Sequence, residues 1–301
     1  MNSTFDGMQW AADMDVSVPY VKIVGGGGTG KTASLARRVA ALRERGIAAK
    51  DILVLCATRS AADAFAGHLA AAGVDGAVEV CTPVQYFQAM LMCPEARAIT
   101  GRTPRLLADF EERILMEDMK VCGLKPKRLR EMLKFFYREL SELGDEKEGF
   151  IQDSEEQDIW DTLQENLRLR GAMLTQELSN VACKFVRDHP DEAAAYRRAF
   201  VLADDFQNLN LATQRTIELL CTTQLVVAGS ANEQVPTTEP YPYPQGFRTF
   251  ELSHVNAQVV TMRENLRAPA RIALMANALV EEGGLDAREL VAAAGEGADA
   301  A

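Results

Sequence analysis

The sequence has few of the residues that build metal or disulfide frameworks, and it lacks long apolar runs. Its 301 residues include only three histidines and six cysteines, with no CxxC pair; the cysteines are Cys56, Cys81, Cys93, Cys122, Cys183 and Cys221. We interpret these scattered cysteines as buried thiols of a reducing cytoplasm. No stretch approaches the roughly 18 apolar residues of a membrane span. Residues 1–14 carry no basic segment, so we expect no signal peptide and a cytoplasmic protein without membrane partners.

The sequence also lacks an excess of positive charge. It has 32 Lys and Arg against 43 Asp and Glu, which gives a formal net charge of −11. This balance argues against a protein that coats nucleic acid with a wholly basic surface, although a local basic groove stays compatible with it. The length allows one large domain or two ordinary ones, each able to bury a core.

Apolar strand-like runs and helical patterns alternate in two blocks of the chain. The predicted strands are 20–24, 52–56, 77–81, 199–203, 224–228 and 259–262, and the predicted helices of these blocks are 35–42, 60–71, 84–92 and 269–282. Between the blocks, from 99 to 189, helical patterns dominate. We therefore predict an α/β protein with a parallel sheet and helices on both faces, interrupted by an all-helical subdomain.

A glycine cluster between the first strand and the first helix fits the phosphate-loop pattern G-x-x-x-x-G-K-[ST]. It runs from Gly25 to Thr32. Glycines let backbone N–H groups converge on phosphate oxygens, and the helix N-terminus adds its positive dipole end. We expect Lys31 to reach the β- and γ-phosphates and Thr32 to ligate Mg²⁺. The residues predicted to bind the nucleotide here are Gly27, Gly28, Thr29, Gly30, Lys31 and Thr32.

Two carboxylates follow the strand 199–203, where a phosphate loop needs an acid for its metal. Asp204 is predicted to hold Mg²⁺ through water, and Asp205 to polarise the attacking water as the catalytic base.

Further segments stand in a recognisable order around the loop and the acid pair. They are Met8-Gln9-Trp10-Ala11-Ala12, Cys56-Ala57-Thr58-Arg59-Ser60-Ala61-Ala62, Thr82-Pro83-Val84-Gln85-Tyr86, Asp204-Asp205-Phe206-Gln207-Asn208, 226–234 and Glu264-Asn265-Leu266-Arg267. As a set they resemble the motifs of the UvrD/Rep-type superfamily 1 DNA helicases, over about residues 2–280. The resemblance implies a RecA-like P-loop NTPase fold and an ATP- and Mg²⁺-dependent helicase that moves 3′–5′ along DNA.

The same resemblance implies roles for residues outside the loop. Gln9 matches the glutamine that reads adenine. Gln207, Gln234 and Arg267 match residues that sense the γ-phosphate, and Gln234 and Arg267 join Lys31 and Asp205 as catalytic candidates. The segments that contact single-stranded DNA contribute Thr58, Arg59 and Thr82. Tyr241, in a Pro/Tyr-rich loop, is a further DNA-binding candidate, and an ordinary surface loop is about as good an explanation there.

Several positions depart from the family pattern. Asp205 stands where the family has Glu, and a misplacement near 1 Å of a catalytic group costs on the order of 10²-fold in rate. The other departures are Ala33, Ala57, Val84, Asn208 and Ser230. Ala57 replaces an aromatic that stacks on a base, a contact worth roughly 1–3 kcal/mol. The glutamine after Ser230 falls one position late, so either Glu233 or Gln234 takes its place.

By the resemblance, residues 1–98 and 190–262 form the RecA-like ATP-binding lobe and 99–189 the helical insert. Residues 263–301 are the start of a second lobe or a C-terminal helix and tail. Nothing after Arg267 matches the motifs of a second RecA-like lobe. We therefore expect this chain by itself not to translocate by the two-lobe mechanism. Two alternatives stay open: the front part of a longer chain, or a naturally shortened relative, with a downstream chain or a protein partner as the source of a second lobe.

Three hypotheses follow for the function. The first is the ATP-binding and hydrolysing lobe of a helicase that contacts single-stranded DNA, with a weakened DNA track. The second is a regulatory module that binds nucleotide or DNA without unwinding. The third is an unrelated P-loop enzyme such as a small-molecule kinase.

A basic run, 125–138, is either a DNA-facing helix or, as we prefer, a solvated helix face with its aromatics in the core.

Overall fold

The computed structural model describes residues 9–74, 77–123, 125–230, 232–233, 240–283 and 291–292. The chain divides into two compact units. Unit 1 comprises Met1–Thr82, Arg198–Leu209 and Cys221–Ala301, and unit 2 comprises Pro83–Arg197 and Asn210–Leu220. The domain boundaries drawn from the sequence stay a prediction.

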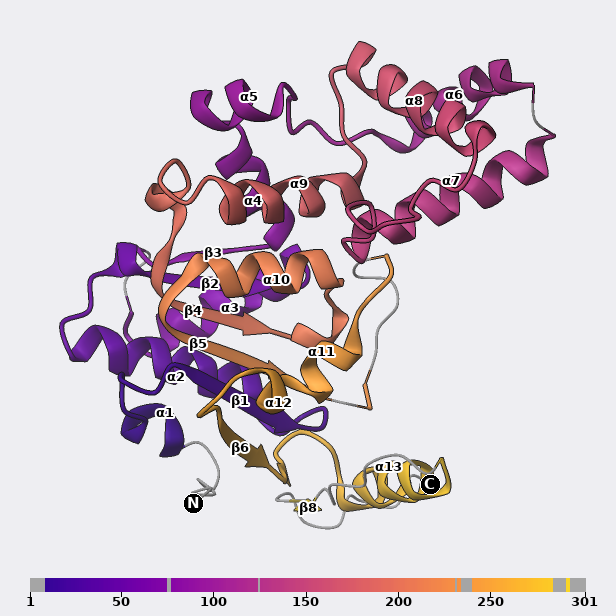
Figure 1. Ribbon diagram of the computed structural model, residues 1–301. Coiled ribbons are helices and arrows are strands. Elements are labelled where there is room, and N and C mark those ends of the chain that lie inside the picture. Colours follow the sequence, from indigo (N-terminus) through magenta and orange to yellow (C-terminus); the bar gives the residue numbers. More distant parts are fainter. Residues whose placement is uncertain are drawn as a thin grey trace. The chain divides into compact units, whose positions relative to one another are not determined.

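Unit 1 contains a six-stranded parallel sheet with the strand order β3-β2-β4-β5-β1-β6 (Figure 1). The strands are β1 (Tyr20–Gly25), β2 (Ile52–Cys56), β3 (Glu79–Cys81), β4 (Arg198–Asp204), β5 (Cys221–Gly229) and β6 (Gln258–Met262). Each predicted strand is present, and the α/β class with a parallel sheet is confirmed. The inner strands are nearly continuous apolar runs because both of their faces are covered.

Successive side chains of β1 point to opposite faces of the sheet and show what covers each face in unit 1. Val21 and Ile23 point into a core shared with helices α1 (Trp10–Asp13), α2 (Lys31–Glu44) and α3 (Arg59–Ala71). Lys22, between them, points to the opposite face, where its ammonium meets the carbonyl of Arg248 and the carboxylate of Glu251. Those partners belong to α11 (Pro244–Arg248) and α12 (Phe250–Ser253). Helices on both faces are therefore confirmed.

The remaining described elements complete unit 1. They are the 3₁₀ turns η2 (Ala49–Asp51) and η5 (Phe206–Asn208), helix α13 (Ala270–Glu282), and the two-stranded parallel pair β7 (Glu264–Asn265) and β8 (Val291–Ala292). The carboxyl ends of β1 and β4 lie on the same edge of the sheet with only β5 between them. This edge is where parallel sheets bind ligands, and it brings the glycine loop near the acid pair.

A buried arginine joins α2 to the sheet of unit 1. Arg38 is fully buried, and its guanidinium donates to Gln224 Oε1 on β5 at 2.6 and 3.1 Å. It also donates to the carbonyl oxygens of Ala11 and Met14, at 3.3 and 2.7 Å. Burial lowers the pKa of Arg38 to about 10. The acceptors of these hydrogen bonds are neutral groups, and Met14 O also accepts from Arg45 at 3.1 Å.

Unit 2 is helical throughout its described elements, as the sequence predicts for the insert. They are α4 (Pro83–Leu91), α5 (Pro94–Thr100), α6 (Asp109–Asp118), η3 (Met119–Cys122), α7 (Pro126–Ser141), α8 (Ser154–Leu169), α9 (Thr175–Asp188), η4 (Ala194–Tyr196) and α10 (Leu211–Leu220). On α7 the basic side chains are exposed, whereas Leu129, Leu133 and Phe136 are buried in a core with α8. This arrangement, a solvated basic face over an apolar one, agrees with the preferred interpretation, and DNA binding by that face stays an untested alternative.

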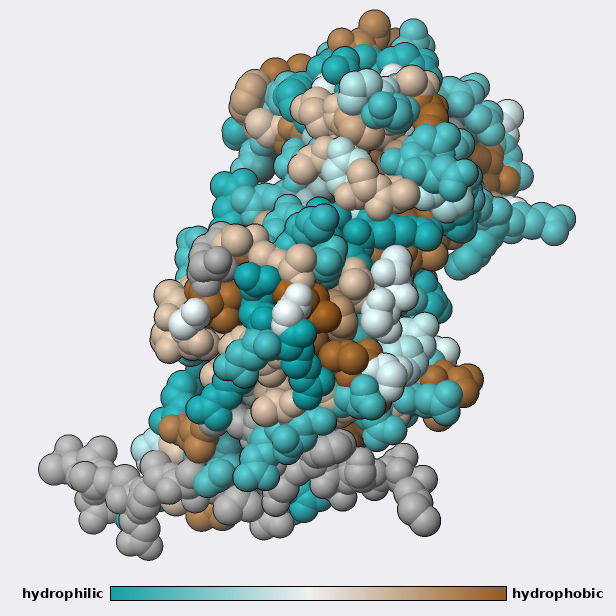
Figure 2. Space-filling view, turned by 90° about the vertical axis from the view of Figure 1, so that its left-hand side faces the viewer, coloured by the Kyte–Doolittle hydropathy of each residue, from teal (hydrophilic) through white to brown (hydrophobic). Residues whose placement is uncertain are grey.

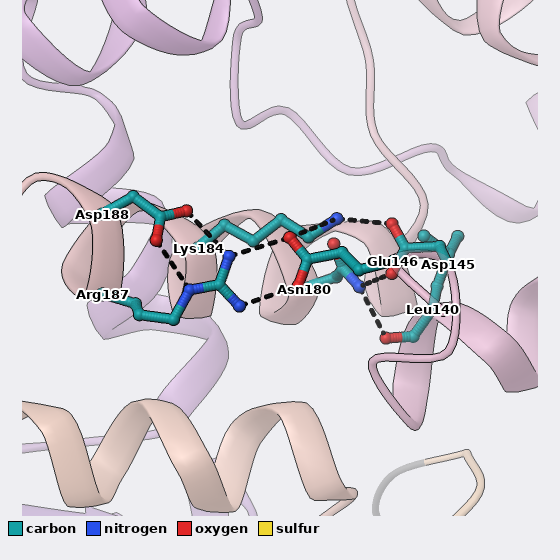
Figure 3. Close-up of polar contacts among 7 residues, drawn as sticks. All are labelled: Leu140, Asp145, Glu146, Asn180, Lys184, Arg187 and Asp188. Carbon is teal, nitrogen blue, oxygen red and sulfur yellow. Dashed lines mark hydrogen bonds and ion pairs between the residues drawn. The ribbon is translucent and has the colours of Figure 1, made fainter. Parts of the chain in front are cut away.

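A polar network ties α9 to the segment that follows α7 (Figure 3). The amide of Asn180, which is buried, donates to Leu140 O at 3.1 Å and to Asp145 Oδ1 at 2.8 Å. Lys184 pairs with Asp145, and Arg187 makes two contacts with Glu146, at 2.7 and 2.8 Å. Because the network satisfies its buried donors and acceptors internally, it fixes the connection between α7 and α8.

The prediction of buried thiols is confirmed for two cysteines and holds only in part for three. Cys56 and Cys183 are buried, and burial raises the pKa of both thiols. Cys81, Cys93 and Cys221 are only half-buried, because they lie on the edge strand β3, at the N-cap of α5 and at the start of β5. All five are free thiols, and the side chain of Cys122 lies outside the described residues.

The surface mixes hydrophilic and hydrophobic side chains. On the face drawn in Figure 2, hydrophilic residues predominate and hydrophobic ones occur in small separate groups. Among the described helices, none has the length and apolar composition that a membrane crossing requires.

Candidate nucleotide site

The loop between β1 and α2 has the backbone conformation that its glycines permit. Gly28 and Gly30 have φ angles of +82° and +84°, in the left-handed region that side chains disfavour. A Cβ at Gly28 would lie 2.8 Å from Asn265 Oδ1, and one at Gly25 would lie 2.5 Å from Thr29 Oγ1 and 2.9 Å from a backbone oxygen of β6. The loop is therefore a cradle that only glycine can line at these positions.

Lys31 lies inside this loop. Its side chain is almost buried, and Nζ donates to the carbonyl oxygens of Gly25 and Gly26 at 2.8 and 2.9 Å. Thr29 Oγ1 donates to the same Gly26 oxygen at 2.9 Å. The ammonium of Lys31 therefore lies inside the curve of the loop backbone. An anion bound by the loop N–H groups would contact the ammonium there.

Thr32 and Asp204 meet at the first turn of α2. Thr32 Oγ1 donates to Asp204 Oδ2 at 2.6 Å. Burial of Asp204, followed by the nearby charge of Asp205, raises the pKa of the Asp204 carboxyl to about 6, while the bond from Thr32 and the charge of Lys31 act against that rise. A hydroxyl and a carboxylate side by side are the oxygen ligands that Mg²⁺ prefers. The residues present therefore fit a Mg²⁺–nucleotide group.

Asp205, the predicted base, has an unusual backbone. Its φ is +53° in the left-handed region, which Asp tolerates better than most residues. Its amide donates to Asp204 Oδ1 at 3.1 Å, and its side chain is partly exposed. The two carboxylates thus leave the end of β4 in different environments, one buried against Thr32 and one open to solvent.

Glu233 contacts the loop directly. Its Oε1 accepts a short hydrogen bond from the Gly27 amide. Gln207, which is almost fully buried, donates from Nε2 to the Glu233 carbonyl at 3.0 Å and accepts from the Ser230 amide at 3.3 Å. From the sequence, Glu233 is only an alternative to Gln234. Gln234 lies outside the described residues.

The segment after β6 lies against the same loop. Asn265 is buried, donates from Nδ2 to Gly27 O at 2.9 Å and accepts from the amide of Arg267 at 3.0 Å. The Leu266 amide donates to Gly28 O at 2.8 Å. Arg267 Nη2 would lie 3.4 Å from a Cβ at Gly27, so the guanidinium is at the loop. No role for Asn265 was predicted from the sequence, where its only signal is its place two residues before Arg267 in the same motif.

Gln9 lies beside a different part of α2. Its side chain is exposed, and together with Arg37, Ala41 and Glu44 it lines a hollow on the second half of the helix. The glycine loop is at the other end of α2. The structure therefore does not bring Gln9 together with the loop residues, and its contact with adenine stays a prediction.

The predicted DNA-binding residues follow neighbouring strands. Thr58 comes after β2 and caps α3 by accepting from the Ala61 amide at 3.1 Å, with Arg59 exposed next to it. Thr82 comes directly after β3 and is buried. Tyr241 is partly buried, has a φ of +57° and precedes α11. Thr58 and Thr82 share the carboxyl edge of two paired strands, whereas Tyr241 belongs to the loop after β5.

Comparison with known proteins adds two findings. The family model of the UvrD/REP helicase N-terminal domain matches residues 8–235. Curated relatives include the ATP-dependent DNA helicase UvrD1 of Mycobacterium tuberculosis, strains H37Rv and CDC 1551, and of Mycobacterium bovis. Each is 25% identical over 286 residues, a match that covers 86% of this chain and 37% of the relative. The chain thus spans little more than a third of the length of these relatives.

Proposed function

The chain belongs to the UvrD/REP helicase N-terminal domain family, and we propose that it binds and hydrolyses ATP with Mg²⁺ as the nucleotide-binding lobe of a DNA helicase. The observation that carries this proposal is the 2.6 Å hydrogen bond between Thr32 Oγ1 and Asp204 Oδ2. It joins the threonine of the phosphate loop to the acid at the end of β4, which is the oxygen pair that a P-loop NTPase uses for its metal.

The residues around the loop have separate tasks in this proposal. The loop amides and Lys31 bind the phosphates, and Thr32 and Asp204 hold Mg²⁺, which when bound neutralises charge on the phosphate oxygens. Asp205 orients and polarises the attacking water. Arg267 supplies positive charge to the γ-phosphate, and Asn265 keeps that arginine beside the loop. Gln234 is a further proposed γ-phosphate contact, and Gln9 a proposed adenine contact.

Single-stranded DNA is the proposed second ligand. Thr58, Arg59 and Thr82 lie at the carboxyl ends of β2 and β3, and Tyr241 adds an aromatic ring. The curated relatives are named as DNA helicases. We propose 3′–5′ movement from the family resemblance, with the remaining motor parts supplied by further chain or by a protein partner.

A second candidate is a nucleotide-binding regulatory module without unwinding activity. Asp205 favours it, because its side chain is one methylene shorter than the glutamate of the family, and catalytic groups tolerate little misplacement. DNA-stimulated hydrolysis separates the two candidates. A helicase lobe in its working assembly hydrolyses ATP faster when single-stranded DNA is added, whereas the regulatory module binds ATP without that response.

Equilibrium binding of Mg·ATP tests the proposed function. We expect the wild-type protein to bind and Lys31→Ala to lose binding, because the substitution removes the cation inside the loop. Lys50→Ala, an exposed lysine of unit 1 outside the loop, is the matched control and should bind like the wild type. The proposal is wrong if the wild type shows no binding, or if Lys31→Ala and Lys50→Ala bind equally well.

A further inference from the structure

The Glu233 carboxylate accepts a hydrogen bond from a backbone amide of the phosphate loop. Gly27 N–H donates to Glu233 Oε1, and these residues are 206 positions apart in the chain. A loop amide of this kind is a donor that a phosphate oxygen accepts from in P-loop proteins. A carboxylate and a phosphate cannot both accept the same N–H bond in good geometry, since each requires the oxygen in line with that hydrogen.

The backbone of Glu233 is held where this contact can form. Gln207 donates to the Glu233 carbonyl at 3.0 Å and accepts from the Ser230 amide at 3.3 Å. Gln207 is itself only 2% exposed, so its amide is fixed by the structure around it. The Glu233 side chain, in contrast, is exposed. Its backbone is therefore anchored while its carboxylate is free to rotate away from the loop.

A cation lies close to the same glycine. A Cβ at Gly27 would be 3.2 Å from Glu233 Oε1 and 3.4 Å from Arg267 Nη2. The positive charge of Arg267 and the loop amide both attract the carboxylate to this point. These are also two of the groups that we propose for the phosphates of the nucleotide. The carboxylate therefore faces the partners of the phosphate while carrying the same sign of charge.

We propose that Glu233 is an anionic competitor for the phosphate loop, and that its charge sets how tightly the site binds the polyphosphate of the nucleotide. This inference rests on the proposed function, because it concerns the same loop. Nucleotide binding then requires the carboxylate to leave Gly27. After leaving, the carboxylate remains nearby as a negative charge that repels the phosphates. Both effects weaken binding, and both act on the phosphates rather than on the base.

Removing the charge of Glu233 tests the inference. We expect Glu233→Gln, which keeps the shape of the side chain, to bind Mg·ATP about 10-fold more tightly than the wild type, from the loss of a charged hydrogen bond and of repulsion. Glu233→Ala should tighten binding as well, whereas Glu233→Asp keeps the charge and should stay near the wild type. Glu95→Gln, an exposed carboxylate of unit 2, is the control for the change in net charge.

A second probe separates this effect from a structural one. Magnesium tripolyphosphate has no base, so its affinity should rise in Glu233→Gln by the same factor as that of Mg·ATP. The inference alone is overturned by one set of results. In that set the wild type binds and Lys31→Ala does not, but Glu233→Gln and Glu233→Ala bind both probes no more tightly than the wild type. Absence of binding in all variants, Glu233→Gln included, overturns the proposed function and the inference with it.

Discussion

Asn265 is hydrogen-bonded to Gly27, from Nδ2 to the carbonyl oxygen at 2.9 Å, although the two residues are 238 positions apart. The same side chain accepts from the amides of Arg267 and Ala268, at 3.0 and 2.7 Å. One buried amide thus fixes the turn that carries Arg267 and attaches it to the phosphate loop. Together with the bond from the Leu266 amide to Gly28 O, this side chain sets the position of the arginine relative to the loop.

Asn265→Ala should therefore weaken nucleotide binding and lower stability. The substitution leaves Gly27 O and two amides without their partner, and a buried polar group left unsatisfied costs about 1–3 kcal/mol. We expect that loss in the free energy of unfolding measured in urea, and a Kd for Mg·ATP at least several-fold higher. Gln152→Ala, an exposed amide, is the control. Equal behaviour of the two variants would contradict the role given to Asn265.

Thr32→Val should remove the dependence of nucleotide binding on Mg²⁺. Valine has the shape of threonine but no hydroxyl, so the oxygen that bonds to Asp204 is lost. We expect ATP affinity with Mg²⁺ to fall to the value measured without the metal. The measurement is a pair of ATP titrations, one with Mg²⁺ and one with EDTA. Thr32→Ser keeps the hydroxyl and should retain the metal dependence; a metal-dependent Thr32→Val would refute the assignment.

Gly28→Ala and Gly46→Ala form a matched pair. Both glycines have left-handed backbones, with φ of +82° and +83°, but a Cβ at Gly46 has no atom within 4 Å, whereas at Gly28 it would be 2.8 Å from Asn265 Oδ1. Left-handed backbone costs an alanine about 1–2 kcal/mol, so both variants should lose that stability in thermal unfolding. Only Gly28→Ala should also lose Mg·ATP affinity, about 10-fold or more. Intact binding by Gly28→Ala would show that the loop tolerates a side chain there.

Arg38→Ala and its neighbour Arg37→Ala should differ greatly in stability. Arg38 is fully buried and donates to Gln224 and to two backbone carbonyls, whereas Arg37 is exposed. Loss of several buried hydrogen bonds in Arg38→Ala should lower the free energy of unfolding by about 3 kcal/mol or more. Arg37→Ala should change it by less than about 0.5 kcal/mol. Urea unfolding of both variants tests this, and similar midpoints would be the contrary result.

Much of the fold could be predicted from the sequence because its signals are local. An apolar run such as 52–56 between turn signals predicts a buried strand, and β2 has those bounds. The prediction was less accurate at β5, which begins at Cys221 rather than 224, because polar residues start that strand. The cysteine prediction holds only in part for Cys81, since an apolar context does not show that a strand lies at the edge of a sheet.

The candidate site divides in the same way. The sequence by itself determined the phosphate loop and the acid pair, because both are patterns of neighbouring residues. The loop is recognised by glycine, lysine and threonine at fixed spacing, and the acid pair by two carboxylates at the end of a strand. Only the tertiary structure decided that Glu233 and Asn265 contact Gly27, that Gln207 holds Glu233, and that Gln9 lies beside the second half of α2. Those contacts join residues far apart in the chain, and their geometry depends on strand order and loop path, which residue spacing does not encode.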